Sequence, residues 1–514
     1  MYYDHKIWIG DANGEKVCIV PKMANRHGLI AGATGTGKTI TLKVLAESFS
    51  NAGVPVFLAD VKGDLAGMCR PGEDNTNMQQ RIADFKLNEC GFQYQAYPTT
   101  FWDIFGQSGI PLRTTISEMG PLLLSKLMDL NDTQSDIMSI IFKIADDQDL
   151  LLIDTKDLKA MLQFVSEHNK EFSEEYGNIA KQSIGAILRS LVALEAQGAD
   201  QFFGEPALNI TDWFSTGIDG KGMINILDCQ VLINNPAMYS VFLLWMMSEL
   251  FETLPEVGDM ERPRMVFFFD EAHLLFKDIS KALQEKIEQV VKLIRSKGVG
   301  IYFITQNPKD IPDAVLAQLG NKVQHALRAY TPSEAKAVKA AANAFRPNPE
   351  FDTQEVLTEL GTGEALISVL DEKGIPGIVQ KCRVLPPQSL MGPIAAEERT
   401  KEINMSNLSL RYQQTVDRDS AYEFFQRHNE QTAIAAEEEK EAKRRAKEKE
   451  KTAAKKSRAV KSGVGSVART AGSTVGREIG NAIGKSIGGS FGKKLGGNLG
   501  ASLGRNILGT FFKF

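Results

Sequence analysis

The sequence predicts an α/β protein built around a mostly parallel sheet. Three observations lead to this class. Short apolar runs alternate with longer segments of helical periodicity, the short runs are apolar throughout, and several are followed at once by glycine or by polar residues. Parallel strands are covered by helices on both faces, so they read as continuous apolar runs.

The expected elements follow one another in the order that this class requires. They are a strand at 28–32, a helix at 40–53, strands at 54–60 and 222–228, a helix at 238–254, a strand at 264–270, a helix at about 279–297 and a strand at 299–306. The segment 238–254 is interrupted by two serines and two glutamates and is too short to span a bilayer, so we expect a buried helix. Residues 363–387 are expected to form a closing hairpin.

The chain is expected to divide into three parts. Residues 1–400 form the sheet domain, with a helical insertion at about 100–215, where the apolar pattern becomes mostly helical. Residues 401–461 form a charged linker without an apolar face, for which a solvated helix and disorder are both open. Residues 462–514 form a basic, glycine-zipper-like tail, in which glycine recurs at every fourth position from 472 to 504.

A glycine-rich loop joins the first of these strands to the first helix. Its sequence, GATGTGKT at 32–39, fits the phosphate-binding pattern GxxxxGK[ST]. The residues expected to hold ATP are Gly32, Thr34, Gly35, Thr36, Gly37, Lys38, Thr39 and Thr41. Lys38 is expected to reach the β and γ phosphates, and Thr39 to bind Mg²⁺. A purely structural glycine loop is the alternative, and the strand before it and the helix after it disfavour that reading.

A pair of carboxylates follows the apolar strand MVFFF. Asp270 is then placed at the carboxyl edge of the sheet, where it can bind Mg²⁺, and Glu271 beside it can act as the base for the attacking water. An acidic pair after a buried strand can also cap the next helix. The upstream phosphate loop favours the catalytic interpretation over the cap.

Polar residues at other strand and helix ends complete the predicted site. Gln306, after Thr305, is expected to contact the γ-phosphate and sense hydrolysis. Arg295 precedes that strand and is either an arginine finger for a neighbouring copy or a solvated cation at a helix end, with Arg328 as the second candidate. For Asp60, Lys62 and Asp64, which follow the strand at 54–60, ordering of water or Mg²⁺ and simple solvation both stay open.

With these motifs in order, the sequence resembles the HerA-like branch of the HerA and FtsK ATPases. The matching segments are GLIAGATGTGKT, VFLADVKGDL, MVFFFDEAHLLF, RSKGVGIYFITQNPKDIP and GTGEALIS. The resemblance implies a RecA-like core in a ring, usually a hexamer, that pulls double-stranded DNA through its centre, and it implies that Arg295 acts on the neighbouring copy. HerA proteins normally carry a β-barrel before this core, whereas about thirty residues precede Gly32 here. His273 of the DEAH string is expected to be an ordinary helix-start residue.

The charge distribution sets the tail apart. Residues 440–514 hold 18 Lys/Arg and 4 Asp/Glu, whereas residues 1–439 hold 41 and 60. The tail is therefore expected to contact anionic lipid, nucleic acid or another copy, or to be flexible. The N-terminus has no secretory signal and the five cysteines form no CxxC pair, so we expect a cytoplasmic protein without disulfides or zinc, able to lie at the inner face of the membrane.

These features predict a Mg-ATP-hydrolysing ring motor acting on double-stranded DNA. Two alternatives stay open. One is a membrane-associated or self-assembling ATP-binding scaffold organised by the tail, and the other is a pump ATPase of the conjugation type.

Overall fold

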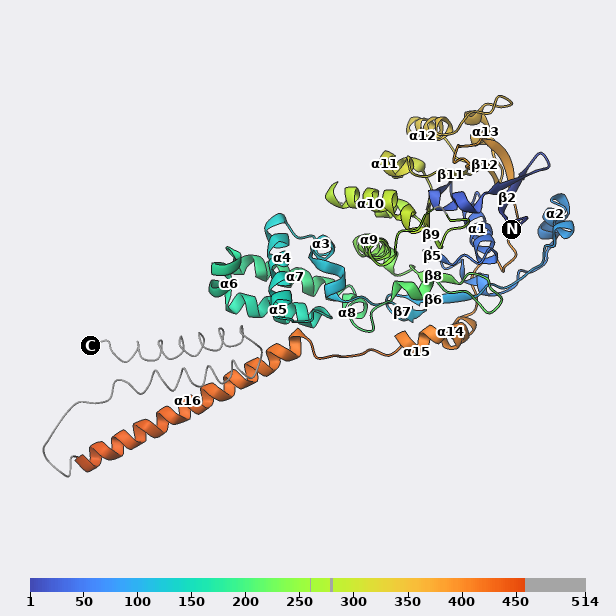
Figure 1. Cartoon of the computed structure of the whole chain (residues 1–514). Coiled ribbons are helices and arrows are strands. Elements are labelled where there is room, and N and C mark those ends of the chain that lie inside the picture. The colour runs from blue at the N-terminus through green and yellow to red at the C-terminus, as the bar shows by residue number, and fades with distance from the viewer. Residues whose placement is uncertain (259, 278–280, 458–514) are drawn as a thin grey trace. The chain divides into compact units, whose positions relative to one another are not determined.

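The computed structural model describes residues 1–258, 260–277 and 281–457 (Figure 1). The predicted tail at 462–514 lies outside the described residues. The chain forms two compact units. Unit 1 combines Met1–Asp129 with Leu194–Val416, and unit 2 combines Leu130–Ala193 with the chain from Asp417 onward.

Unit 1 is built on one sheet of 13 strands, which confirms the predicted α/β class. Eight strands run parallel in the order β11-β4-β10-β9-β5-β8-β6-β7, and the antiparallel strands β12, β13, β2, β1 and β3 continue the sheet beyond β11. The parallel strands are β4 (Gly28–Ala31), β5 (Val56–Asp60), β6 (Thr99–Asp103), β7 (Ile110–Pro111), β8 (Ile224–Asp228), β9 (Met265–Phe269), β10 (Val299–Thr305) and β11 (Asn321–Gln324). The antiparallel strands are β1 (Tyr2–Tyr3), β2 (Lys6–Ala12), β3 (Glu15–Ile19), β12 (Glu364–Ser368) and β13 (Gln380–Val384).

Helices cover both faces of the sheet (Figure 1). On one face lies α1 (Lys38–Asn51), where Phe49 packs with its ring centroid 6.3 Å from that of Phe268 and 6.0 Å from that of Tyr302. The buried residues of this helix face recur at i, i+3, i+4 and i+7 and are Leu42, Leu45, Ala46 and Phe49. Burial of each of the leucine and phenylalanine side chains stabilises the fold by roughly 2 kcal/mol relative to exposure.

The opposite face carries α9 (Pro236–Thr253) and α10 (Lys281–Ile294). α9 is apolar on nearly all sides because it is packed between α10 and α3 (Ile116–Leu127). The predicted buried helix at 238–254 is thereby confirmed. No helix in the described part of the chain is both long and apolar enough to cross a membrane.

The remaining helices of unit 1 lie in the connections. They are α2 (Thr76–Asp84), α8 (Ala199–Phe202), α11 (Asp313–Leu316), α12 (Pro332–Asn343), α13 (Thr353–Glu359), α14 (Ala396–Met405) and α15 (Asn407–Tyr412). The predicted closing hairpin is formed by β12 and β13, which pair antiparallel. Two strands, β6 and β7, fall within the range expected to be a helical insertion.

Unit 2 is helical. It contains α4 (Asp132–Asp147), α5 (Thr155–Glu167), α6 (Asn169–Tyr176), most of α7 (Lys181–Glu195) and α16 (Ala421–Ser457). α16 packs on α5, where the rings of Phe425 and Phe164 stack with centroids 4.4 Å apart. The segment predicted as a charged linker therefore begins in unit 1 with α14 and α15 and continues in unit 2 with α16.

Candidate active site

The phosphate loop lies at the carboxyl end of β4 and leads directly into α1. Its glycines adopt backbone angles that other residues rarely take, with φ of 152° at Gly32 and 116° at Gly37. A Cβ on Gly32 would lie 2.5 Å from the Cβ of His325, so a side chain does not fit there. The tip of the loop, Thr34 and Gly35, is exposed, as a ligand-binding loop requires.

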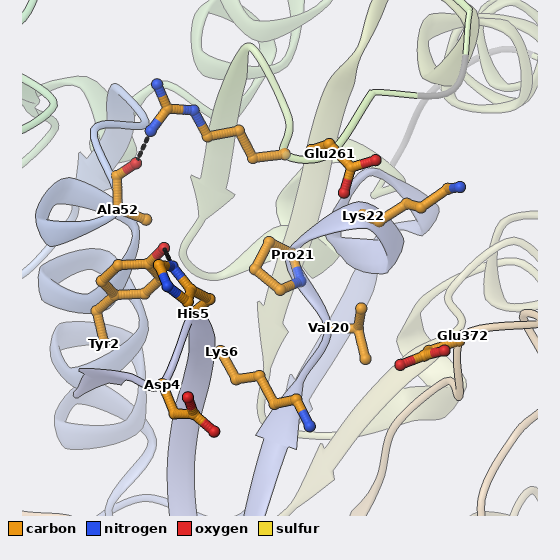
Figure 2. Close-up of a pocket in the computed structure, with 11 residues that line it drawn as sticks. Tyr2, Asp4, His5, Lys6, Val20, Pro21, Lys22, Ala52, Glu261 and Glu372 are labelled. Atoms are coloured by element: carbon orange, nitrogen blue, oxygen red, sulfur yellow. Dashed lines mark hydrogen bonds between the residues drawn. The ribbon is translucent and has the colours of Figure 1, made fainter.

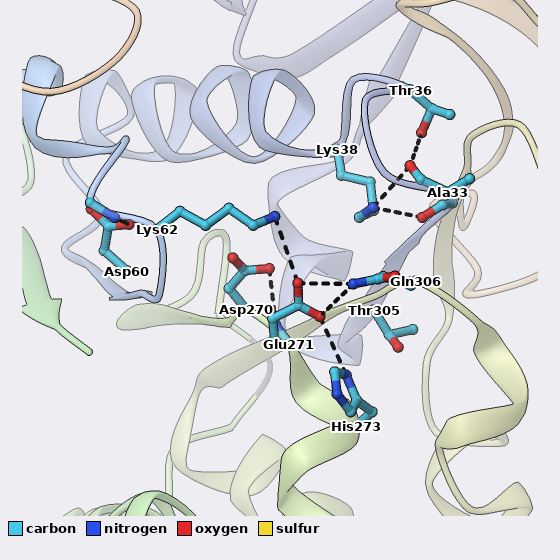
Figure 3. A network of polar contacts seen from close by, with 12 residues as sticks. Ala33, Thr36, Lys38, Asp60, Lys62, Asp270, Glu271, His273, Thr305 and Gln306 are labelled. Carbon is cyan, nitrogen blue, oxygen red and sulfur yellow. Dashed lines mark hydrogen bonds and ion pairs between the residues drawn. The ribbon is translucent and has the colours of Figure 1, made fainter. Parts of the chain in front are cut away.

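The loop holds its own lysine. Lys38 is buried, and its Nζ donates to the carbonyl oxygens of Gly32 at 2.6 Å and Ala33 at 3.1 Å (Figure 3). Burial lowers the pKa of this ammonium group, and the nearby charge of Lys62 adds to that effect. Anionic phosphate oxygens are better partners for an ammonium than neutral carbonyls, so the loop is prepared to accept them.

The two predicted carboxylates follow β9 at the same edge of the sheet. Burial and the adjacent charge of Glu271 raise the pKa of Asp270 to about 7. Asp270 Oδ1 accepts the backbone N–H of Glu271 at 2.9 Å, and its carbonyl oxygen accepts the Tyr239 hydroxyl at 2.9 Å. The backbone of Glu271 is left-handed, with φ of 48°, which is unusual for a residue with a side chain.

The carboxylate of Glu271 is contacted from three sides (Figure 3). Lys62 Nζ lies 3.6 Å from Oε1, and the amide of Gln306 donates to Oε1 at 3.3 Å and to Oε2 at 3.4 Å. His273 Nδ1 lies 3.3 Å from Oε2. These partners hold the carboxylate in one orientation, and two of them, Lys62 and Gln306, come from segments far from Glu271 in the sequence.

The structure thus brings together four of the predicted site elements. The phosphate loop, the Asp270–Glu271 pair and Gln306 follow β4, β9 and β10, which are neighbours in the sheet. Lys62 joins them from the loop after β5, whereas the Asp60 carboxylate accepts the N–H groups of Gly63 and Leu65 and so shapes that loop. Among the described residues Asp64 has no hydrogen bond or ion pair to this site, and its charge adds to the rise that burial causes in the pKa of Asp60.

The residues at this edge fit a magnesium ion held jointly with a triphosphate. Thr39 lies in the first turn of α1, and Asp270 supplies a buried carboxylate whose pKa burial raises although the charge of Lys62 offsets part of that rise. In the described ranges no group of three or more His, Cys, Asp or Glu side chains is arranged to hold a metal. Magnesium commonly takes one or two protein ligands and completes its shell with water and phosphate oxygens, which agrees with this donor set.

Thr41 differs from the other loop residues. Its side chain is fully buried, and its hydroxyl lies 2.8 Å from Nε2 of His325. A nucleotide contact by this hydroxyl stays a prediction, because the group already has a partner inside the protein. The nucleotide contacts of Thr34, Gly35 and Thr36 stay predictions as well, although Thr36 Oγ donates to the Ala33 carbonyl and so stabilises the loop.

His325 is a residue of this site that sequence reasoning missed. Its Nδ1 lies 2.9 Å from the Glu364 carbonyl oxygen, so it donates there and leaves Nε2 to accept from Thr41. Burial lowers the pKa of the imidazole to about 4, and the charge of Lys38 adds to that effect. A lone histidine after a short strand carries no signal that its partner is Thr41, more than 280 positions earlier.

The structure does not bring Arg295 to the phosphate loop of its own chain. Arg295 is exposed and opens the short 3₁₀ helix Arg295–Lys297 before β10, so it lies at the amino edge of the sheet. It is close to His27, which precedes β4; burial lowers the pKa of His27 to about 4, and the Arg295 charge contributes. Arg328 instead donates to the carbonyl oxygens of Thr358 and Leu360 within its own chain.

A second cavity, of about 630 Å³, lies at the amino edge as well (Figure 2). It is bordered by segments that precede β4 and β9 and by Ala52, which follows α1. Arg262 closes one side through a hydrogen bond to the Ala52 carbonyl oxygen. None of the predicted site residues lines this cavity, which is therefore separate from the nucleotide site.

Comparison with known proteins agrees with this geometry. Over residues 6–513 the chain matches the family described as Helicase HerA-like C-terminal. The chain belongs to this HerA-like family. The resemblance predicted from the five motif segments is thereby confirmed, and with it the RecA-like P-loop NTPase class of the sheet domain.

The relatives of this chain include two proteins that carry the name HerA. The chain is 22% identical over 363 residues to the DNA double-strand break repair helicase HerA of Sulfolobus acidocaldarius, which covers 67% of this chain and 62% of that protein. It is 22% identical over 350 residues to the protein of that name from Sulfurisphaera tokodaii, which covers 66% and 62%. The chain thus spans less than two thirds of the length of these HerA relatives.

Solved structures similar to this HerA-like chain include a plasmid coupling protein and a VirB4 protein. The plasmid coupling protein TrwB, in complex with a non-hydrolysable GTP analogue, has a TM-score of 0.47 at 12% identity, covering 72% of this chain and 87% of that one. VirB4 of Thermoanaerobacter pseudethanolicus has a TM-score of 0.46 at 16% identity, covering 77% and 98%.

Proposed function

We propose that this chain hydrolyses ATP with Mg²⁺ and that identical copies, arranged as a ring, use the hydrolysis to move along double-stranded DNA. The observation that carries the proposal is the convergence of Lys38, Asp270, Glu271 and Gln306 at one edge of the sheet. A carboxylate base beside a phosphate loop is the arrangement that water-dependent cleavage of a phosphoanhydride requires. Membership of the HerA-like family supports duplex DNA as the polymer, because the family relatives are named as DNA helicases.

Each residue of the proposed site then has a chemical role. Lys38 exchanges the carbonyls of Gly32 and Ala33 for phosphate oxygens, and the Thr39 hydroxyl and the Asp270 carboxylate hold Mg²⁺, which when bound offsets the charge of the phosphates. Glu271 accepts the proton of the attacking water. Gln306, which donates to Glu271 in this structure, is placed to change partners between that carboxylate and the γ-phosphate.

The position of Arg295 supports a neighbouring copy as part of the site. The arginine is exposed at the amino edge of the sheet, opposite the phosphate loop, so it is free to meet the carboxyl edge of the next subunit. A cation supplied in this way stabilises the charge of the transition state. A hexameric ring and a membrane-facing tail belong to the same proposal.

The proposal is tested by the rate of ATP hydrolysis of the full chain with and without blunt-ended duplex DNA, run beside a mass measurement by light scattering. We expect duplex DNA to raise kcat, and Lys38→Ala to lower hydrolysis at least about 100-fold because the phosphate charge loses its partner. Lys22→Ala, at the opposite edge of the sheet, is the matched control and should behave as wild type.

The outcomes separate the parts of the proposal. A hydrolysis rate that is the same with and without duplex DNA would reject DNA as the polymer but leave the proposed nucleotide site standing. Wild-type hydrolysis by Lys38→Ala rejects the site itself, and a monomeric mass in the presence of ATP rejects the ring.

A further inference from the structure

Glu271 and His273 form a contact that the proposed hydrolysis does not yet use. His273 lies in the 3₁₀ helix Ala272–Leu275, directly after the base, and its Nδ1 is 3.3 Å from Glu271 Oε2. The two atoms are close but lack hydrogen-bond alignment, and Nδ1 is buried without any hydrogen-bond partner. A buried nitrogen without a partner is costly, so a native protein keeps one where another state of the molecule supplies the bond.

The surroundings indicate what that state is. The other partners of the Glu271 carboxylate are Lys62 Nζ, 3.6 Å from Oε1, and the Gln306 amide nitrogen, 3.3 Å from Oε1 and 3.4 Å from Oε2. All three distances are longer than is usual for charge-assisted hydrogen bonds. The strained backbone of Glu271 keeps the carboxylate among these three groups. When Gln306 turns to a γ-phosphate, a small rotation of the carboxylate brings Oε2 into line with Nδ1.

A second carboxyl, that of Asp310, interacts with His273 through its charge. Asp310 ends the 3₁₀ helix Pro308–Asp310, which follows β10. Burial raises the pKa of Asp310, and His273 offsets part of that rise. Carboxylates near an imidazole favour one orientation of its ring.

We propose that His273 is a positioning residue for Glu271, which completes a hydrogen bond from Nδ1 to the carboxylate when Gln306 leaves it. His273 does not touch the nucleotide; it fixes the oxygen that takes the proton of the attacking water. The inference rests on the proposed hydrolysis and assigns a role that the DEAH string alone does not indicate.

The test compares three variants of the full chain in steady-state ATP hydrolysis. His273→Ala is expected to lower kcat about 10-fold with KM for ATP unchanged, because ATP contacts stay intact while the base loses its orientation. His273→Asn places an amide nitrogen where Nδ1 was and is expected to restore most of the rate. In a Glu271→Gln background, His273→Ala is expected to cause no further loss, since both changes act on one step.

Each result has one meaning. A wild-type kcat in His273→Ala, an equal loss in His273→Asn, or a further 10-fold loss in the Glu271→Gln background overturns the positioning role and leaves the proposed function standing. Failure of the proposed function looks different, because the wild type would then hydrolyse no more ATP than Lys38→Ala. Tryptophan fluorescence at the working temperature verifies folding, since all four tryptophans lie in unit 1.

Discussion

At the scale of single residues, two buried histidines connect distant segments of unit 1 through their uncharged rings. His27 bridges the Val291 carbonyl oxygen at 2.9 Å and the Ile301 N–H at 3.0 Å. His325 bridges Thr41 and the Glu364 carbonyl oxygen beside the phosphate loop. Burial lowers the pKa of each ring to about 4, so protonation of either ring opposes the folded state.

This linkage predicts that the stability contributed by each ring decreases as the pH falls. A pKa of about 4 in the folded chain against 6.5 in the unfolded chain means that the unfolded state gains the proton first, so the contribution of the ring is complete above about pH 6.5 and is lost toward pH 4. His325→Gln removes one titrating ring while keeping an amide between the same partners. We expect its unfolding free energy to fall less steeply than that of wild type, by about 1.4 kcal/mol per pH unit between pH 6 and 5.

Urea unfolding followed by tryptophan fluorescence measures this difference, because it reports on unit 1. His5→Gln, which replaces an exposed histidine, is the matched control and should follow the wild-type profile. Parallel pH profiles for wild type and His325→Gln would contradict the account.

The residues found from the sequence and those missed differ in a physical way. Lys38, Asp270, Glu271 and Gln306 belong to local patterns, in which a strand end and its next residues carry the signal. His325 acts through a partner that only the tertiary fold brings near, and the contact of His273 with Glu271 depends on the left-handed backbone at Glu271. The sequence therefore predicts only an ordinary helix-start residue at His273. It does not predict the contact of His273 with Glu271.

At the scale of elements, α16 is attached to the other helices of unit 2 through the amino end of α5. Asp157 is almost fully buried and accepts four hydrogen bonds, from Ile153 N–H and Asp154 N–H just before α5 and from Ser420 Oγ and Tyr422 N–H at the start of α16. One carboxylate thus caps α5 and anchors α16.

Removal of this carboxylate is expected to loosen α16. Asp157→Ala leaves buried donors without partners, at a cost of about 1 to 3 kcal/mol for each that water does not reach. Hydrogen exchange of the full chain is expected to show faster exchange in α5 and in the first turns of α16, with α1 and α9 unchanged. Glu174→Ala, exposed on α6, is the matched control. Equal protection of α5 and α16 in wild type and Asp157→Ala would refute the anchoring role.

The elements were predictable where the apolar pattern continues over many residues. The helix at 238–254 and the hairpin at 363–387 have clear patterns, and the structure confirms both. β6 and β7 were not foreseen, because five and two residues are too few to show a period within a helical region. The attachment of α16 was not foreseen either, since Phe425, which stacks on Phe164, lies in its first turns, whereas most of its length is rich in charged residues.

At the scale of the whole molecule, the sheet separates two charged groups that the proposed reaction needs together. Lys38 follows the carboxyl end of β4, whereas Arg295 precedes β10 at the amino end of the sheet. Under the proposed function, one edge of the parallel sheet would bind nucleotide and the other would present the arginine. Two copies packed edge to edge would then complete one site.

Mixing of inactive variants tests this division. Lys38→Ala and Arg295→Ala are each expected to lose hydrolysis, and an equimolar mixture is expected to regain part of it, because an intact loop of one copy then meets an intact arginine of the next. Lys292→Ala, exposed on α10, is the matched control and should stay active alone. A mixture as inactive as its components, at a mass that shows mixed oligomers, would exclude Arg295 as the residue supplied by the neighbour.

The central claim is that three loops at the ends of β4, β9 and β10 form one hydrolytic site with Glu271 as its base. The most direct measurement pairs ATP binding with single-turnover hydrolysis in Glu271→Gln. The account predicts wild-type affinity for ATP and a hydrolysis rate lower by at least about 100-fold, because the amide cannot accept the proton of water. Hydrolysis by Glu271→Gln at the wild-type rate would contradict it.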